Sequence, residues 1–189
     1  DYQAYAGTAA PTPGGSVPGS DARQLPVTTR ELERVAAAVL TYARRGGATA
    51  AEADISQGVG QSVTVRHGEV ETIAYNRDKS IGVTVYVGQR RGNASTADFS
   101  DASVAAAVDK AIAIARYTAQ DPAAGLADER RLASNWADLD LYHPWDLSVE
   151  AAIELGRVAE AAALGVDPRI TNSEGATVAR SESEFMYAN

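Results

Sequence analysis

The chain has 189 residues, of which 45% are hydrophobic and 22% charged, a composition typical of one ordinary globular domain. Its 17 Lys and Arg residues against 25 Asp and Glu residues give a formal net charge of −8, which disfavours binding to nucleic acids and to anionic membrane surfaces. The absence of cysteine excludes disulfides, thiolate nucleophiles and zinc–thiolate sites, and fits a reducing compartment. No apolar run approaches the roughly 18 residues that a membrane-spanning helix needs.

The first 27 residues are rich in Ala, Pro, Gly, Ser and Thr. Such a stretch buries too little apolar surface to offset the entropy of ordering it. We therefore expect residues 1–27 to form a flexible tail and residues 28–189 to form the folded domain.

The folded part is expected to begin with an amphipathic helix. Thr28 and Glu31 have capping-box spacing, apolar residues then recur at helical intervals, and Gly46 and Gly47 provide a stop.

Short strands are expected next, because period-two alternation recurs between turn signals. The expected strands are residues 51–56, 62–66, 69–75, 80–87 and 90–96. The pair Gly58 and Gly60 is interpreted as a hairpin connection, His67 with Gly68 as a tight turn, and Asn76, Arg77 and Asp78 as a further turn. Turns this short make neighbouring strands antiparallel.

The second half is expected to contain two more helices and a closing strand pair. Ser100 caps one helix, a long irregular connection follows over residues 119–147, and Ser148 starts a helix that ends near Leu164, with Ala152, Leu155, Ala159 and Ala162 facing inward. Residues 170–173 and 176–187 are expected to be strands joined at Glu174 and Gly175. These elements predict an α+β fold in which an antiparallel β-meander sheet packs against two to three amphipathic helices.

No catalytic set emerges from the residues alone. The two histidines, His67 and His143, lie far apart in sequence at predicted turns, which is unlike the paired histidines of zinc peptidases. The segment that starts at Asp138 begins like a calcium loop but lacks the third oxygen ligand and the glycine. Paired carboxylates such as Glu69 and Glu71 are more simply a solvated strand face. What remains is a sheet with free edges, to which an extended peptide or another subunit could add a strand.

Several segments together resemble the TldD/PmbA family of cytosolic metallopeptidases. Their sequences are most similar to the PmbA (TldE) branch of that family. They are GEVETIAYNRD (68–78), IGVTVYVG (81–88), ASTAD (94–98), ARYTA (115–119), DP (121–122), GLAD (125–128), DLDLY (138–142), WDL (145–147) and TNSEGA (171–176). The resemblance runs from about residue 28 to residue 189.

This resemblance implies properties that the residues do not show by themselves. It implies a cytoplasmic heterodimer with a TldD-like subunit, which trims or degrades peptides and unfolded segments. It also implies that the metal, zinc, is bound by the TldD-like partner through a His-Glu-x-x-x-His motif and a later cysteine. Neither feature occurs here, so no catalytic or metal-binding residue is carried over. Family members continue into a β-rich C-terminal domain, so this chain is expected to be an N-terminal portion.

Three hypotheses follow. The first is a non-catalytic N-terminal portion of a PmbA-like subunit, in which two turns help to form the subunit interface or substrate cavity: Asn76, Arg77 and Asp78, and Ser173, Glu174 and Gly175. The second is a standalone module that binds peptides by strand addition, without a protease partner. The third is an independent hydrolase that uses Asp and Glu residues.

Overall fold

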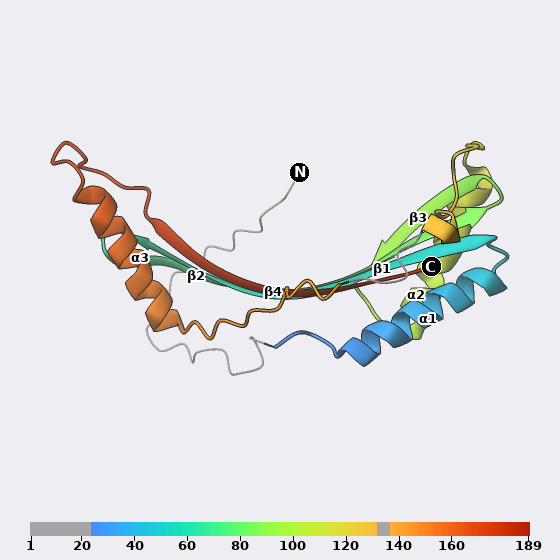
Figure 1. Cartoon of the computed structure of the whole chain (residues 1–189), viewed down its shortest axis with the longest axis horizontal. Helices are drawn as coiled ribbons and strands as arrows, with labels where there is room; N and C mark the ends of the chain where they lie inside the picture. Colours follow the sequence, from blue (N-terminus) through green and yellow to red (C-terminus); the bar gives the residue numbers. More distant parts are fainter. Residues whose placement is uncertain (1–23, 132–136) are drawn as a thin grey trace.

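The computed structural model describes residues 24–131 and 137–189. Figure 1 shows a long curved sheet with helices at both of its ends. The elements in chain order are α1 (Thr29–Arg45), β1 (Ala50–Arg66), β2 (Glu69–Val87), β3 (Arg90–Thr96), α2 (Asp101–Tyr117), a short 3₁₀ helix (Glu129–Arg131), α3 (Val149–Leu164) and β4 (Ala176–Ala188). Residues 1–23, the larger part of the predicted tail, lie outside the described residues.

The sheet has the order β3-β2-β1-β4, and every neighbouring pair is antiparallel. This confirms the predicted α+β class and the meander of β1, β2 and β3. The predicted turn between β1 and β2 is also confirmed: His67 and Gly68 both have positive φ, 51° and 75°, as the two central residues of a tight hairpin turn require. Strand β4 returns to pair with the other side of β1.

The predicted breaks inside the long hairpin are wrong. Strand β1 runs without interruption through Gly58 and Gly60, and β2 runs through Asn76 and Asp78, so that Gly60 pairs with Asn76 and Gly58 with Asp78. A Cβ on Gly60 would collide with the side-chain amide of Asn76. Residues that favour turns in β1 therefore pair with residues that favour turns in β2. The hydrogen-bonded ladder between the two strands continues because Gly60 leaves room for the side chain of Asn76.

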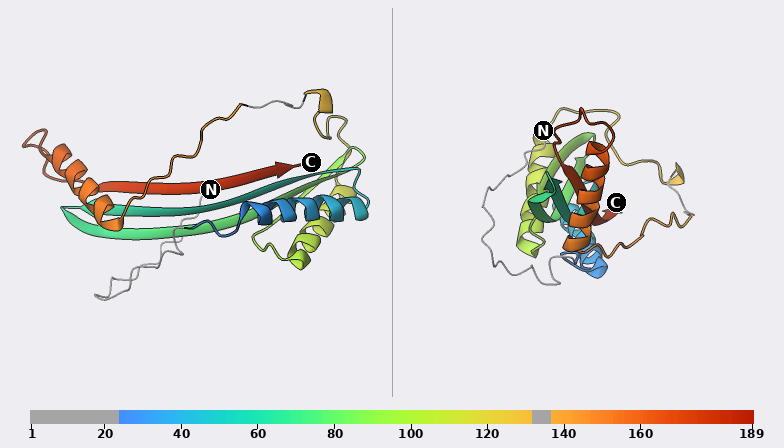
Figure 2. Two further views of the ribbon diagram at one scale, coloured as in Figure 1. Left: turned by 60° about the horizontal axis from the view of Figure 1, so that its bottom comes forward. Right: turned by 90° about the vertical axis from the view of Figure 1, so that its left-hand side faces the viewer.

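The three α-helices of the described residues cover the same face of the sheet, but they form two separate cores. Helices α1 and α2 pack at one end, where the largest cluster includes Leu32, Ile55, Val83 and Val108. Helix α3 packs at the other end on a smaller cluster of Val63, Val65, Leu147, Val149 and Ala152. Figure 1 and the left view of Figure 2 show α3 and the α1–α2 pair at opposite ends of the strands.

Each predicted helix start is confirmed by its cap. Thr28, Ser100 and Ser148 are the N-cap residues of α1, α2 and α3, and the side-chain oxygen of each accepts a hydrogen bond from the backbone N–H three residues later. These bonds satisfy N–H groups that the first turn of a helix leaves free.

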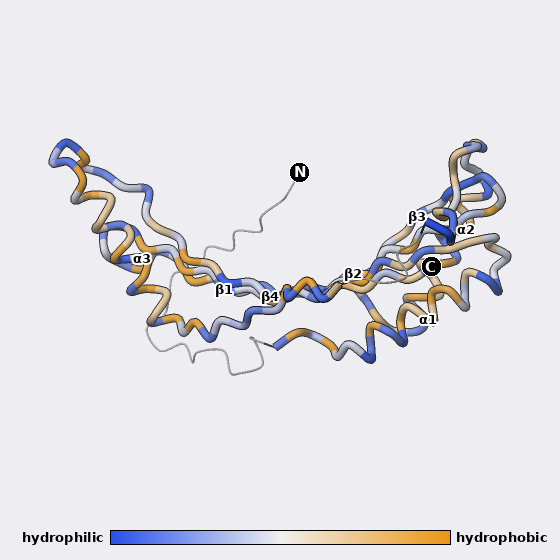
Figure 3. Tube along the Cα trace, viewed as in Figure 1, coloured by the Kyte–Doolittle hydropathy of each residue, from blue (hydrophilic) through white to orange (hydrophobic). Residues whose placement is uncertain are grey.

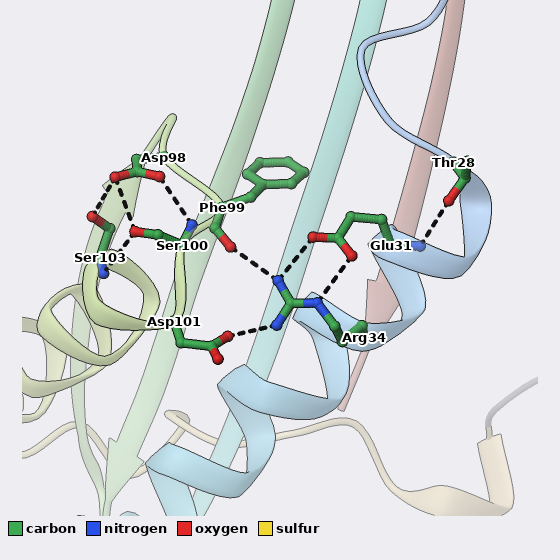
Figure 4. A network of polar contacts seen from close by, with 8 residues as sticks. All are labelled: Thr28, Glu31, Arg34, Asp98, Phe99, Ser100, Asp101 and Ser103. Carbon is green, nitrogen blue, oxygen red and sulfur yellow. Dashed lines mark hydrogen bonds and ion pairs between the residues drawn. The ribbon is translucent and has the colours of Figure 1, made fainter.

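A polar network then fixes α1 against the start of α2 (Figure 4). Arg34 of α1 donates to both carboxylate oxygens of Glu31, to Asp101 and to the backbone carbonyl of Phe99. Its guanidinium is the main cause that lowers the pKa of Glu31. On the α2 side, Asp98 accepts hydrogen bonds from Ser100 and Ser103. The two helices thus enter the larger core in a fixed relative position.

Two further predictions about the second half are wrong. Residues 170–173 form no strand, since β4 begins only at Ala176. Leu155, Ala159 and Ala162 do not face inward: Leu155 is 45% exposed, and the buried residues of α3 are instead Val149, Ala152, Gly156 and Glu160.

Candidate functional site

The residues predicted for the first functional turn lie in the middle of β2. Asn76 and Asp78 point to the face of the sheet that carries no helix among the described residues, because they pair with Gly60 and Gly58, whereas Arg77 points to the helix-covered face. The amide nitrogen of Asn76 donates to a carboxylate oxygen of Asp78 at 3.1 Å. These residues therefore belong to a strand surface, and the prediction that they form a turn is corrected.

The second predicted turn lies at the α3 end of the sheet, where it leads into β4. The backbone N–H of Gly175 donates to Oγ of Ser173 at 2.8 Å, and Nε of Arg66 donates to the Ser173 carbonyl at 3.1 Å. Gly175 has φ 93° and lies against Val65, whose carbonyl oxygen would be 2.5 Å from an added Cβ. Val65 is five positions after Gly60 in β1, a distance of roughly 17 Å at strand rise. The structure thus does not bring the two predicted turns together.

A cleft of about 340 Å³ lies along the edge of the sheet at the middle of β4. One wall consists of residues 141–145 and the other of residues 179–183 of β4. Within the described residues β4 pairs only with β1, so its outer backbone edge faces this cleft. The lining residues are Leu141, Tyr142, His143, Pro144, Trp145, Ala179, Arg180, Ser181, Glu182 and Ser183.

The cleft combines features that suit an extended polypeptide. Tyr142 and Trp145 are 66% and 50% exposed, so their rings are accessible for apolar contacts. Arg180 and Glu182 form an ion pair of 3.1 Å on β4 and are largely shielded from solvent. An unpaired strand edge beside aromatic side chains can bind a peptide backbone by strand addition. Sequence analysis predicted the free edge but not the cleft, because the opposite wall comes from the irregular connection.

A polar band crosses the helix-covered face between the two cores. In it the side-chain amide of Gln57 pairs with the backbone of Val27 as another peptide group would. Its oxygen accepts a hydrogen bond from the N–H of Val27 at 2.8 Å, and its nitrogen donates to the Val27 carbonyl at 2.9 Å. The same nitrogen also donates to a carboxylate oxygen of Glu184 at 2.9 Å. Gln61 lies on the same face four residues later and is 5% exposed, yet neither atom of its amide has a hydrogen-bond partner among residues 24–131 and 137–189. The band contains one satisfied and one unsatisfied glutamine.

Glu160 is a buried carboxylate that the sequence analysis missed. Its two oxygens accept hydrogen bonds of 2.8 Å from the backbone N–H groups of Gly68 and His67 at the tip of the β1–β2 hairpin. These bonds lower the pKa of Glu160, the one from Gly68 contributing most. A signal was present, because Ala152, Gly156 and Glu160 recur at four-residue intervals on the inward face of α3. The side chain fastens α3 to the hairpin and has no visible catalytic partner among the described residues.

The described residues do not fit a metal site. Nowhere in residues 24–131 and 137–189 do three or more His, Asp or Glu side chains gather as metal ligands would. His67 occupies the hairpin tip, where its backbone N–H is bound by Glu160, and His143 lies at the cleft, 3.8 Å from Asp140.

Two family models match the chain. Residues 51–115 match "PmbA/TldA metallopeptidase domain 1", and residues 142–189 match "PmbA/TldA metallopeptidase central domain". The chain is 45% identical over 152 residues to metalloprotease PmbA of Escherichia coli O157:H7. It belongs to the PmbA/TldD family. A PmbA homologue of Haemophilus influenzae is 40% identical over 160 residues. The two alignments cover 80% and 85% of this chain but only 34% and 35% of the relatives, so the chain spans about a third of their length.

Solved structures agree on the fold. A putative modulator of DNA gyrase from Bacteroides thetaiotaomicron superposes with a TM-score of 0.68 at 24% identity, covering 85% of this chain and 36% of that one. TldE from Thermococcus kodakarensis gives a TM-score of 0.63 at 12% identity, covering 82% of this chain and 35% of that one. The curved sheet with helices at both ends is therefore a PmbA/TldD fold. None of the helices built from the described residues has the length and apolar composition that a bilayer crossing requires.

Proposed function

We propose that this chain is the non-catalytic N-terminal portion of a PmbA/TldE-like subunit in a heterodimeric metalloprotease of the cytoplasm. In this proposal residues 28–189 form the N-terminal α+β domain, a TldD-like subunit binds the zinc, and the complex trims or degrades peptides and unfolded segments. The main support is the 45% identity to a metalloprotease PmbA over 80% of the chain.

The β4 cleft is the part of this chain that we assign to substrate. A peptide segment would lie along residues 179–183 and use the outer backbone edge, with Tyr142 and Trp145 in contact with its side chains. Backbone pairing does not depend on side-chain identity, so this site suits unfolded segments of varied sequence. The two clusters predicted from sequence, Asn76–Asp78 and Ser173–Gly175, remain proposed contacts of the substrate cavity or the subunit interface.

The test is reconstitution with a TldD-like subunit. We expect size-exclusion chromatography to show a complex, and an unfolded polypeptide to be cleaved only when both subunits are present. A metal chelator should abolish that cleavage. Cleavage by the present chain alone, persisting in chelator, would contradict the proposal and favour an independent hydrolase that uses carboxylates.

A standalone peptide-binding module is the second candidate, and the free edge of β4 specifically favours it. In this case the chain would bind an unfolded peptide with the same affinity whether or not a TldD-like subunit is present. Substituting Trp145→Ala should weaken peptide binding under both hypotheses, with Trp145→Phe as the conservative control. Size-exclusion chromatography with the TldD-like subunit distinguishes the two hypotheses, because a standalone module does not form a complex with that subunit.

A further inference from the structure

Helix α3 carries an exposed apolar stripe beside the face that packs on the sheet. Leu155 and Val158 are 45% and 58% exposed, and Val166, just beyond the end of the helix, is 78% exposed. Exposed alanines complete the stripe at helical spacing. Its members are Ala151, Leu155, Val158, Ala159, Ala162 and Val166.

The stripe makes α3 apolar around most of its circumference. The neighbouring side is buried on β1 and β4 through Ala152 and Gly156, and the charged residues Glu150, Glu154 and Arg157 gather on the remaining side. Along α3 the tube of Figure 3 has mainly hydrophobic colours. A helix that is apolar on two sides is typical of one packed on two sides. Among the described residues, however, only the sheet side is covered.

We propose that α3 packs antiparallel against α3 of a second copy of this chain, across a two-fold axis that passes between Val158 and Ala159. The sequence of the stripe is complementary to itself about this point. Leu155 then lies opposite Ala162 of the second copy, Val158 opposite Ala159, and Val166 opposite Ala151. Each level of the contact pairs one large residue with one small residue, which allows two helices to interdigitate closely.

The two-fold arrangement is what favours a second copy over an unrelated partner. An isologous interface requires a patch that complements itself, with residue i meeting residue j and j meeting i. The three large–small pairs meet this requirement without a gap, and no charged residue falls inside the stripe. One helix per subunit is a small interface, so we expect a reversible dimer with a micromolar dissociation constant. Because each copy carries a net charge of −8, added salt should strengthen the dimer.

The first experiment is sedimentation equilibrium of the 189-residue chain over a concentration series. We expect a monomer–dimer equilibrium whose dissociation constant rises at least tenfold in Leu155→Lys, since that change buries a charge against Ala162 of the second copy. Tyr117→Lys is the matched control, because Tyr117 is an exposed apolar residue, 92% accessible, at the opposite end of the molecule. The control should dimerise like the wild type.

The second experiment tests the register by exchanging one large–small pair. Ala162→Leu should weaken the dimer because two leucines then collide, and Leu155→Ala should weaken it because a gap opens. The double variant Leu155→Ala/Ala162→Leu exchanges the two roles and should restore the wild-type dissociation constant. A merely destabilised α3 would not recover in this way, and urea unfolding of the dilute monomer checks the fold of each variant.

The outcomes are separate from those of the proposed heterodimer. A wild-type chain that stays monomeric at all concentrations, or a dimer unaffected by Leu155→Lys, overturns this inference even if the TldD-like complex forms. Loss of only the TldD-like complex in Leu155→Lys, with no self-association, also overturns it and assigns the stripe to that partner. Failure of the TldD-like complex with an intact α3 dimer overturns the proposed function alone.

Discussion

Arg34 stabilises the packing of α1 on α2 through several charge-assisted hydrogen bonds. We expect Arg34→Leu to lower the free energy of unfolding by about 1 kcal/mol, because the bonds to Glu31, Asp101 and the Phe99 carbonyl are lost from a side chain that is still 43% exposed and therefore screened. Urea denaturation at low salt measures the effect. Arg30→Leu is the control, since Arg30 is exposed on the same helix with no hydrogen bond to another described side chain. Equal losses in both variants would show that the network contributes nothing.

The two glutamines of the polar band should respond to the same substitution with opposite signs. Gln57→Met removes three hydrogen bonds and should destabilise the fold by about 1–2 kcal/mol. Gln61→Met replaces a buried amide that has no partner by an apolar side chain of similar volume, and should stabilise the fold by about 1 kcal/mol. Thermal unfolding of both variants distinguishes the cases. If Gln61→Met destabilises the fold as well, a partner such as a buried water must satisfy the amide.

At the scale of elements, the helices could be predicted from sequence because their signals are local. Thr28, Ser100 and Ser148 each act within one turn of the helix that they start, so neighbouring residues contain all the necessary information. The predicted strand breaks are wrong because Gly60 and Asn76 have turn propensity individually, and only their pairing across the ladder keeps both extended. The orientation of α3 also needed the tertiary structure, since both sides of the helix are apolar. The cleft could not be predicted, because its walls are about 40 residues apart in sequence.

The attachment of α3 to the β1–β2 hairpin should depend on pH. The N–H groups of Gly68 and His67 hold the pKa of Glu160 below its ordinary value of 4.5. The stabilisation is therefore complete above about pH 4.5 and is lost as the pH falls through the lower pKa of the folded state. Glu160→Gln should be less stable than the wild type at pH 7, and the difference should shrink steadily below pH 4.5. Urea midpoints from pH 7 to pH 2.5 measure this, with Glu154→Gln, an exposed residue of the same helix, as the control. A constant difference across this range would rule out the carboxylate as its source.

At the scale of the whole molecule, one continuous sheet connects two cores of unequal size. The polar band of Gln57, Gln61, Arg180, Glu182 and Glu184 separates them, so in the part of the chain that the structure describes no apolar cluster extends from one end to the other. The α3 cluster contains five buried residues, whereas the α1–α2 cluster contains eighteen. Since buried apolar area dominates stability, the α3 end should open locally without unfolding of the other end.

Native-state hydrogen exchange can test this independence with one truncation in each core. Val63→Ala removes about 2 kcal/mol of packing at the α3 end and should speed amide exchange roughly 30-fold in α3 and the hairpin tip, leaving α1 and α2 unchanged. Val85→Ala is the matched change in the larger core, since both valines are fully buried in neighbouring strands of the same sheet. Because the whole fold depends on the larger core, Val85→Ala should speed the exchange of the slowest amides in α1 and α2. If Val63→Ala accelerates exchange equally at both ends, the strands transmit stability through the polar band and the molecule unfolds as one unit. Independent opening would instead allow the α3 end to move relative to the α1–α2 end while the strands between them stay paired. The β4 cleft lies between those two ends, at the middle of β4.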